Sequence, residues 1–161
     1  IFDRKIHNIE NIESLKDLIC DVDVVVHLGG VNSGTSYNPS IAELVDGNAF
    51  FTSQLLLAIK KYNKKCPQFI FLSSIHVYDK TDLLFSEKNK ARPNTSYGSM
   101  KYTQELLINQ ASESGIVKSI IFRAGHIYGP KSKPFYNTAI ATLIHKIINK
   151  MKKLILIYIF L

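Results

Sequence analysis

"VDVVVHLGG", residues 22–30, is an apolar run with four valines that ends in two glycines. A continuous apolar run of this length is typical of a strand that is buried on both faces of a parallel sheet. "QFIFLSS" (68–74) and "VKSIIFR" (117–123) have the same character, and each also ends in small or polar residues. Ligands bind at the carboxyl ends of strands in such sheets, so we expect a site along that edge.

Helical patterns separate the three expected strands. A long one, 41–63, follows Asn38-Pro39-Ser40, and a second runs from about 96 to 114 with Gly115 as its C-terminal stop. A third is expected within 137–153. Strands that alternate with helices of this length form right-handed βαβ units. The predicted fold class is therefore α/β, with a partial, doubly wound, parallel Rossmann-like sheet.

The composition is that of an ordinary globular chain of one domain. Of its 161 residues, 46% are hydrophobic and 20% are charged. Cys20 and Cys66 provide neither a disulfide framework nor a metal-ligand spacing, and no metal site is expected. Both cysteines adjoin apolar runs, which predicts buried thiols and a reducing, cytoplasmic location. The apolar run at 154–161 is too short to span a bilayer, which needs about 20 residues, so no membrane partner is expected.

The formal charge of +7 is unevenly distributed along the chain. Residues 116–161 contain eight Lys or Arg and no Asp or Glu, which leaves the first 115 residues at 12 − 13 = −1. A basic half of this kind can meet nucleic acid, an anionic membrane or a phosphorylated small molecule. No aromatic residues are interleaved with these lysines in the way nucleic-acid binding favours, so solvated lysines on a helix face are the preferred interpretation.

Tyr97 and Lys101 are the pair that indicates chemistry. They are four residues apart near the start of the second long helical pattern, and hence on one helix face. A tyrosine has an ordinary pKa near 10, and a neighbouring ammonium lowers it by favouring the phenolate. Ser74, at the end of the preceding strand, can hold the same substrate oxygen. The three residues suit proton transfer coupled to hydride transfer.

Five segments between residues 21 and 130 carry a family resemblance, in the expected order: DVDVVVHLGG, GNAFFTSQLLLA, FIFLSSIHVY, PNTSYGSMK and FRAGHIYGP. In these segments the chain resembles the extended short-chain dehydrogenase/reductases. In particular, it is similar to the NAD-dependent epimerase/dehydratase group that acts on nucleotide sugars.

The resemblance implies a role for each matching position. Tyr97 is the expected general acid/base, Lys101 lowers its pKa and contacts the nicotinamide ribose, and Ser74 binds the reacting hydroxyl. The implied cofactor is NAD or NADP. Besides Tyr97 and Lys101, the positions expected to line it are Asn8, Leu28, Gly29, Gly30, Asn48, Ser73 and Gly125. The implied substrate is a nucleotide sugar, and the residues expected to contact it are Ser74, Asn32 and His126.

Some positions depart from the family pattern. Asn8 stands where an aspartate commonly reads the adenine, and His126 replaces an asparagine near the substrate. Ile75 and His76 stand where sugar 4,6-dehydratases carry Asp-Glu, so dehydration is disfavoured and epimerase or reductase chemistry remains. His27, inside its strand, is interpreted as structural.

The G-x-x-G-x-x-G loop of the family does not occur in the sequence. We therefore expect a fragment that lacks the first strands, with residues 1–150 as a partial NAD(P)-binding domain and 151–161 as the start of a truncated substrate region. The alternative is a non-catalytic remnant or binding module of the same fold. By analogy with the family, a homodimer through 39–62 and 96–114 is also expected.

Overall fold

The three expected strands form one parallel sheet in the order β1-β2-β3. The structure is a computed structural model that describes residues 8–32, 38–79, 85–125, 127, 129–135 and 139–149. The strands are β1 (Val24–His27), β2 (Gln68–Ser74) and β3 (Lys118–Ala124). Val24 of β1 pairs with Gln68 of β2, which in turn pairs with Lys118 of β3. This parallel α/β arrangement confirms the predicted fold class.

The helices follow the predicted order, with one difference in winding. After a short 3-10 turn, η1 (Ile12–Leu15), they are α1 (Lys16–Ile19), α2 (Ile41–Leu44), α3 (Phe51–Tyr62), α4 (Ser96–Glu113) and α5 (Ala139–Ile148). Ser40 starts α2 with a capping box to Glu43, and Gly115 follows α4 with a φ of 70°. The predicted single helix over 41–63 contains a π-helical segment, η2 (Val45–Phe50), between α2 and α3.

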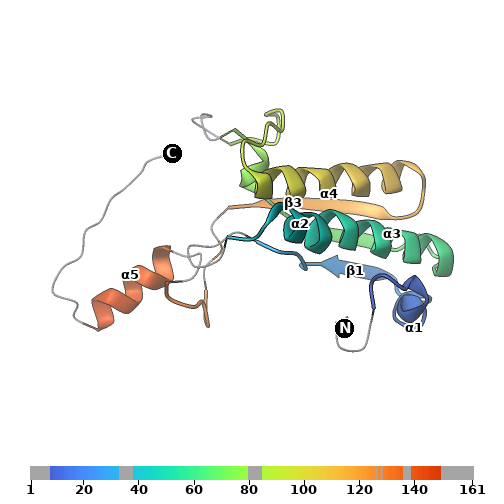
Figure 1. Cartoon of the computed structure of the whole chain (residues 1–161), viewed down its shortest axis with the longest axis horizontal. Coiled ribbons are helices and arrows are strands. Elements are labelled where there is room, and N and C mark those ends of the chain that lie inside the picture. The colour runs from blue at the N-terminus through green and yellow to red at the C-terminus, as the bar shows by residue number, and fades with distance from the viewer. Residues whose placement is uncertain are drawn as a thin grey trace.

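The core lies between the sheet and the helices on one of its faces. In Figure 1, α3 and α4 run side by side along the strands. Phe69 and Phe71 of β2 are fully buried there, against Ile59 of α3 and Ile108 of α4. These side chains alternate along β2 with residues that point to the opposite face, as the pleat of a strand requires.

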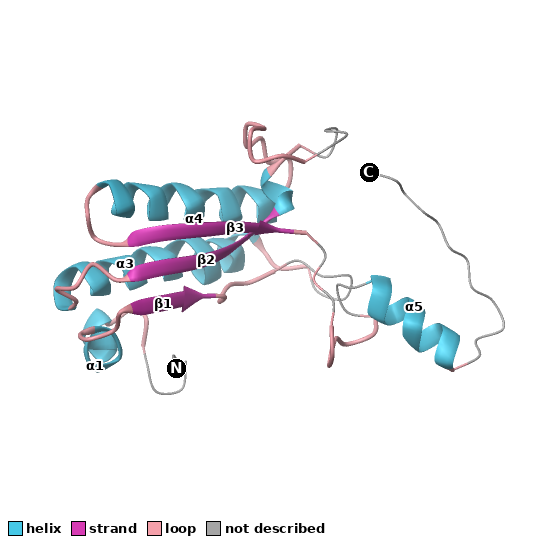
Figure 2. Cartoon of the chain, turned by 180° about the vertical axis from the view of Figure 1, so that it is seen from behind, coloured by secondary structure: helices cyan, strands magenta, loops and turns pink. Residues whose placement is uncertain are grey.

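The opposite face of the sheet is largely exposed among the described residues. Val26 of β1 is 57% exposed, Phe122 of β3 is 55% exposed, and Val24 and Ile120 also reach solvent. Helix α5 does not cover this face, because it lies apart from the sheet in both views (Figures 1 and 2). The expectation that the first strand is buried on both faces is therefore wrong for the described part of the chain. The residues of β1 are mostly apolar on both faces of the sheet, but the described helices cover only one of these two faces.

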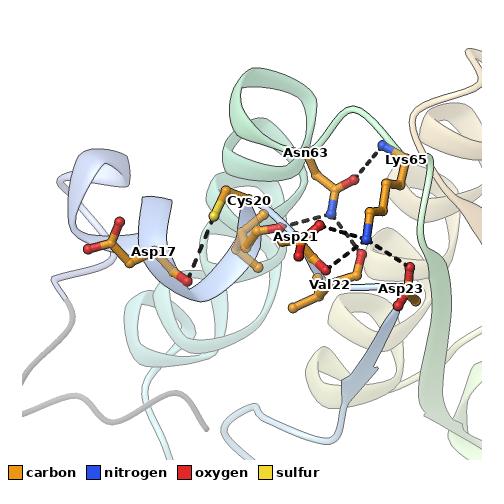
Figure 3. Close-up of polar contacts among 8 residues, drawn as sticks. Asp17, Cys20, Asp21, Val22, Asp23, Asn63 and Lys65 are labelled. Atoms are coloured by element: carbon orange, nitrogen blue, oxygen red, sulfur yellow. Dashed lines mark hydrogen bonds and ion pairs between the residues drawn. The ribbon is translucent and has the colours of Figure 1, made fainter.

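A polar cluster ties the loop before β1 to the end of α3, at the amino edge of the sheet (Figure 3). The Asn63 side-chain amide donates 2.8 Å hydrogen bonds to the carbonyls of Ile19 and Val22. Lys65 forms exposed ion pairs with Asp21 and Asp23, at 2.6 and 3.3 Å. These contacts fix where β1 begins beside β2.

Cys20 and Cys66 are free thiols, but the burial expected of them is wrong for Cys20, which is exposed, while Cys66 is partly buried. A cytoplasmic location stays a prediction. Within the described ranges no helix combines the length and apolarity needed to cross a membrane. The run at 154–161 and the end of the third predicted helix lie outside the described residues.

Candidate active site

The carboxyl ends of the three strands meet at one edge of the sheet, as expected for parallel strands. The ladder pairs Ser73 of β2 with Arg123 of β3, and Ser74 with Ala124. Both serines are buried. The segment that follows β1 is exposed along three residues, Leu28, Gly29 and Gly30. This edge therefore combines buried hydroxyls on one strand with open backbone on the next.

Gly98 allows α4 to approach the end of β2. After Ser74 the chain turns through η3 (Ile75–Val77), and the Ser74 hydroxyl accepts a 3.2 Å hydrogen bond from the amide of His76. A Cβ on Gly98 would lie 2.1 Å from the His76 carbonyl oxygen, so only glycine fits without a shift. Thr95 caps the helix by accepting from the Gly98 amide at 3.1 Å. The first turn of α4, which carries Tyr97, therefore packs directly against this turn.

Tyr97, on the first turn of α4, lies beside Ser74 at the end of β2. Burial raises the pKa of Tyr97 above its ordinary value, and the neighbouring Ser74 hydroxyl acts in the opposite direction. At neutral pH the phenol is therefore protonated and able to donate. The Tyr97 ring also meets the His76 ring edge to face, with 5.8 Å between centroids. The structure thus places two of the three predicted catalytic residues next to one another.

Lys101 lies one helical turn after Tyr97 and is only 6% exposed. Its Nζ donates a 3.1 Å hydrogen bond to the carbonyl of Leu72 and lies 4.8 Å from the centre of the Phe71 ring. Burial lowers the pKa of Lys101 to about 8, while the carboxylate of Glu105 raises it. The Lys101 ammonium therefore points toward β2 and not toward the Tyr97 hydroxyl. Both side chains nevertheless come from the part of α4 that packs against the carboxyl end of β2.

A tight backbone approach follows β1 at Gly30, which has a φ of 150°. A Cβ there would lie 2.5 Å from the Asn48 side-chain oxygen. Asn48, in η2, is fully buried, and its Nδ2 donates 2.9 Å hydrogen bonds to the carbonyls of Val31 and Leu44. Its Oδ1 has no hydrogen-bond partner within the described ranges. An open glycine segment supported by a buried amide fits the close backbone approach that a dinucleotide needs.

The remaining predicted positions are less closely joined to this group. The Oδ1 of Asn8 accepts from the amide of Glu10 at 3.0 Å, which stabilises a local turn. Asn32 is half-buried, next to the Val31 carbonyl that Asn48 holds. Gly125 is exposed after β3, and a Cβ there would lie 3.8 Å from the Ile75 side chain. His126 lies outside the described residues.

Two buried polar groups behind the site were not predicted from the sequence. In the first, His27 Nε2 lies 2.9 Å from the Thr52 hydroxyl, and Gln104 donates to that hydroxyl at 2.7 Å. Burial lowers the pKa of His27 to about 4, so its imidazole is uncharged at neutral pH. In the second, Glu105 of α4 binds Arg123 of β3. The spacing of Glu105, four residues after Lys101, could have indicated a carboxylate on this face of α4, but not its pairing with Arg123.

The model of the NAD dependent epimerase/dehydratase family matches residues 4–158. The chain belongs to this family. The family that the five sequence segments predicted is thereby confirmed.

Curated relatives share between a quarter and a third of the aligned residues. A UDP-2-acetamido-2,6-beta-L-arabino-hexul-4-ose reductase of Pseudomonas aeruginosa is 28% identical over 138 residues, which are 86% of this chain and 32% of that protein. The uncharacterized UDP-glucose epimerase YtcB of Bacillus subtilis is 30% identical over 125 residues, 74% of this chain and 38% of that protein. The chain therefore spans about a third of the length of these relatives.

Two solved structures with similar folds contain a bound nicotinamide cofactor. UDP-glucuronic acid 4-epimerase from Bacillus cereus, in complex with UDP-glucuronic acid and NAD, matches with a TM-score of 0.72 and 29% identity, over 89% of this chain and 44% of that one. RMD from Pseudomonas aeruginosa, complexed with NADPH, matches with a TM-score of 0.68 and 25% identity, over 79% of this chain and 44% of that one. The cofactors in these neighbours are the two that the resemblance implies for this chain.

Proposed function

We propose that this chain carries the reaction site of an NAD(P)-dependent enzyme that epimerises or reduces a nucleotide sugar. The observation that carries the proposal is the placement of Tyr97 beside Ser74 and the buried Lys101, at the carboxyl edge of a parallel sheet. Membership of the epimerase/dehydratase family supports it, as do the nucleotide-sugar enzymes among the relatives.

Tyr97 handles the proton in this proposal. Because burial keeps its phenol protonated, Tyr97 donates its proton to the oxygen of a substrate carbonyl as hydride reaches the carbonyl carbon. In the reverse direction Tyr97 takes the proton of the substrate hydroxyl as hydride leaves the same carbon. Ser74 holds the reacting oxygen, and the positive charge of Lys101 favours the phenolate that remains after donation. A bound NAD(P) supplies or accepts the hydride.

The cofactor is expected to lie along the segment that follows β1. Leu28, Gly29 and Gly30 are exposed there. Asn48 stabilises the loop by donating a hydrogen bond to the carbonyl of Val31. Ser73 and Gly125, at the ends of the next two strands, extend the same edge. On family resemblance alone, we propose that Asn8 contacts the adenine of the cofactor and that Asn32 and His126 contact the substrate.

Epimerisation or reduction is proposed in preference to dehydration. Elimination of water from a sugar needs an additional acid and base, and the two residues after Ser74 are Ile75 and His76 rather than carboxylic acids. A dTDP-D-glucose 4,6-dehydratase of Dictyostelium discoideum is nevertheless among the relatives, at 29% identity. The choice therefore rests on these two positions and not on overall similarity.

The second candidate is a non-catalytic module of the same fold. The observation that favours it is the exposed apolar face of the sheet, because parallel sheets are ordinarily covered on both faces. We account for this face by proposing that the chain is part of a longer polypeptide, since it spans 44% of the solved neighbours.

We also propose a homodimer through the outer faces of α3 and α4. Leu57 of α3 is 48% exposed and Leu106 of α4 is 51% exposed, which leaves an apolar position on each helix. Leu106→Glu is expected to convert the dimer into a monomer in sedimentation experiments. A species of unchanged size would count against this interface.

Incubation with NAD or NADP and a UDP-sugar tests the catalytic proposal. The polypeptide that contains this chain is mixed with UDP-glucose or UDP-glucuronic acid, the sugar is followed by proton NMR, and the nicotinamide by absorbance. An epimerase changes the sugar without net change of the nicotinamide, whereas a reductase, run in reverse, oxidises a hydroxyl of the sugar and converts NAD(P) to NAD(P)H. If neither changes although the nucleotide binds, the non-catalytic candidate is supported instead.

A further inference from the structure

A buried ion pair stands behind the candidate active site. Glu105 of α4 is 1% exposed, and its carboxylate accepts three hydrogen bonds from the Arg123 guanidinium, at 2.7, 3.0 and 3.2 Å. The hydroxyl of Ser73 donates to the same carboxylate at 2.5 Å, and Arg123 also donates to the Tyr78 hydroxyl at 2.8 Å. The planar guanidinium, with its hydrogen bonds in a fixed fork, fixes the orientation of this carboxylate.

The Glu105–Arg123 ion pair adjoins both the strand and the helix that carry the predicted catalytic residues. Ser73 directly precedes Ser74 on β2 and pairs with Arg123 across the sheet. Glu105 lies one helical turn after Lys101, on the same face of α4. The carboxylate thus joins the strand that supplies the serine to the helix that supplies the tyrosine and the lysine.

Lys101 itself occupies apolar surroundings. No ion pair within 4.0 Å involves Lys101 in the described part of the chain, and its partners are the Leu72 carbonyl and the face of the Phe71 ring. From β1 it faces His27, which burial keeps neutral, and on its own helix Tyr97, which burial also keeps neutral. Arg123, from β3, is engaged by Glu105. The carboxylate of Glu105 is the charge that opposes loss of the Lys101 proton.

We propose that Glu105 is a positioning residue that holds Lys101 in its charged form beside Ser74 and Tyr97. The inference rests on the proposed function, because the charge of Lys101 matters to a reaction only if Tyr97 exchanges a proton with substrate. Ser73 and Arg123 orient the carboxylate, and the carboxylate stabilises the ammonium one turn away. The competing interpretation is that Glu105 only fastens α4 to the sheet.

A titration of Lys101 separates the two interpretations. The polypeptide that contains this chain is labelled with [ε-13C]lysine, and the Lys101 signal is assigned by its loss in Lys101→Met. Its midpoint is then followed by NMR from neutral to alkaline pH. Glu105→Gln is expected to lower the midpoint by about one pH unit, a tenfold loss of proton affinity. Ser73→Ala removes a hydrogen bond to the same carboxylate but no charge, so it is expected to leave the midpoint within a few tenths of a unit.

An unchanged midpoint in Glu105→Gln would overturn the proposal. So would a rise of the same size in both variants, because that is what a loosened, hydrated site produces. Glu105→Gln/Arg123→Gln is measured as well, because Glu105→Gln alone leaves the Arg123 guanidinium unpaired, and that positive charge also lowers the midpoint. A smaller lowering is expected in the double variant, and an unchanged midpoint there would also overturn the proposal. The readout needs no turnover. A lowered midpoint in a protein without activity would therefore refute the proposed function and leave the effect of Glu105 on Lys101 standing.

Discussion

Gly98→Ala should damage the site more than it damages the fold. The new Cβ would lie 2.1 Å from the His76 carbonyl oxygen, whereas a Cβ in a folded protein essentially never comes closer than 3.0 Å to another heavy atom. The first turn of α4 must therefore move away from η3 by at least 3.0 − 2.1 = 0.9 Å. Overpacking of this kind costs about 1–3 kcal/mol, and the better helix propensity of alanine offsets about 1 kcal/mol. The expected net loss of stability is therefore up to about 2 kcal/mol.

Displacement of the turn also separates Tyr97 from Ser74. A misplacement of about 1 Å can lower turnover about a hundredfold. The matched control is Gly115→Ala, at the other end of the same helix, where φ is 70° and no atom lies within 4 Å of the new Cβ. That change costs a similar amount, about 1–2 kcal/mol, through backbone strain alone.

Urea unfolding and turnover are measured on both variants. The two midpoints are expected to fall by comparable amounts, while turnover falls about a hundredfold only in Gly98→Ala. Equal turnover in the two variants, or a Gly98→Ala midpoint at or above that of the parent, would refute the argument that this close approach builds the site.

Three further predictions concern stability and surface. Because the pKa of His27 is lowered from 6.5 to about 4, the folded state binds fewer protons than the unfolded state between these values, so up to about 3 kcal/mol of stability is lost as pH falls from 6.5 to 4. His27→Gln should flatten this dependence in urea unfolding, and an unchanged slope would count against it. Asn63→Ala leaves two carbonyls without their donor and should cost about 1–2 kcal/mol, measured against a smaller loss in Lys65→Ala. The 161-residue chain should bind the dye ANS at its exposed sheet face and bind it less in Phe122→Ser, and absence of dye fluorescence would contradict this.

The sequence was sufficient for the order of elements because apolar runs and helical periodicity alternate along it. The strands, the start of α4 after Thr95 and its termination before Gly115 follow from local signals of this kind. The proximity of Tyr97 to Ser74 could also be expected, since one residue ends a strand and the other lies in the first turn of the next helix along the same edge. Local pattern and topology together determined these features.

Other features depend on packing that the pattern does not encode. The π-helical winding of η2 brings Asn48 beneath the loop after β1, but one extra residue in a turn barely changes apolar periodicity. The direction of the Lys101 ammonium, toward the Leu72 carbonyl, depends on side-chain geometry. The pairing of Glu105 with Arg123 joins residues 18 apart on different elements, so neither position alone indicates it.

The most direct test of the account is Tyr97→Phe in the polypeptide that contains this chain, with turnover and NAD(P) binding measured on the same sample. The account predicts that turnover of the nucleotide sugar falls at least about a hundredfold while nucleotide binding stays within a few-fold of the parent, because the substitution removes only the proton donor. Turnover that stays close to the parent value would contradict the assignment of Tyr97 as the residue that moves the proton.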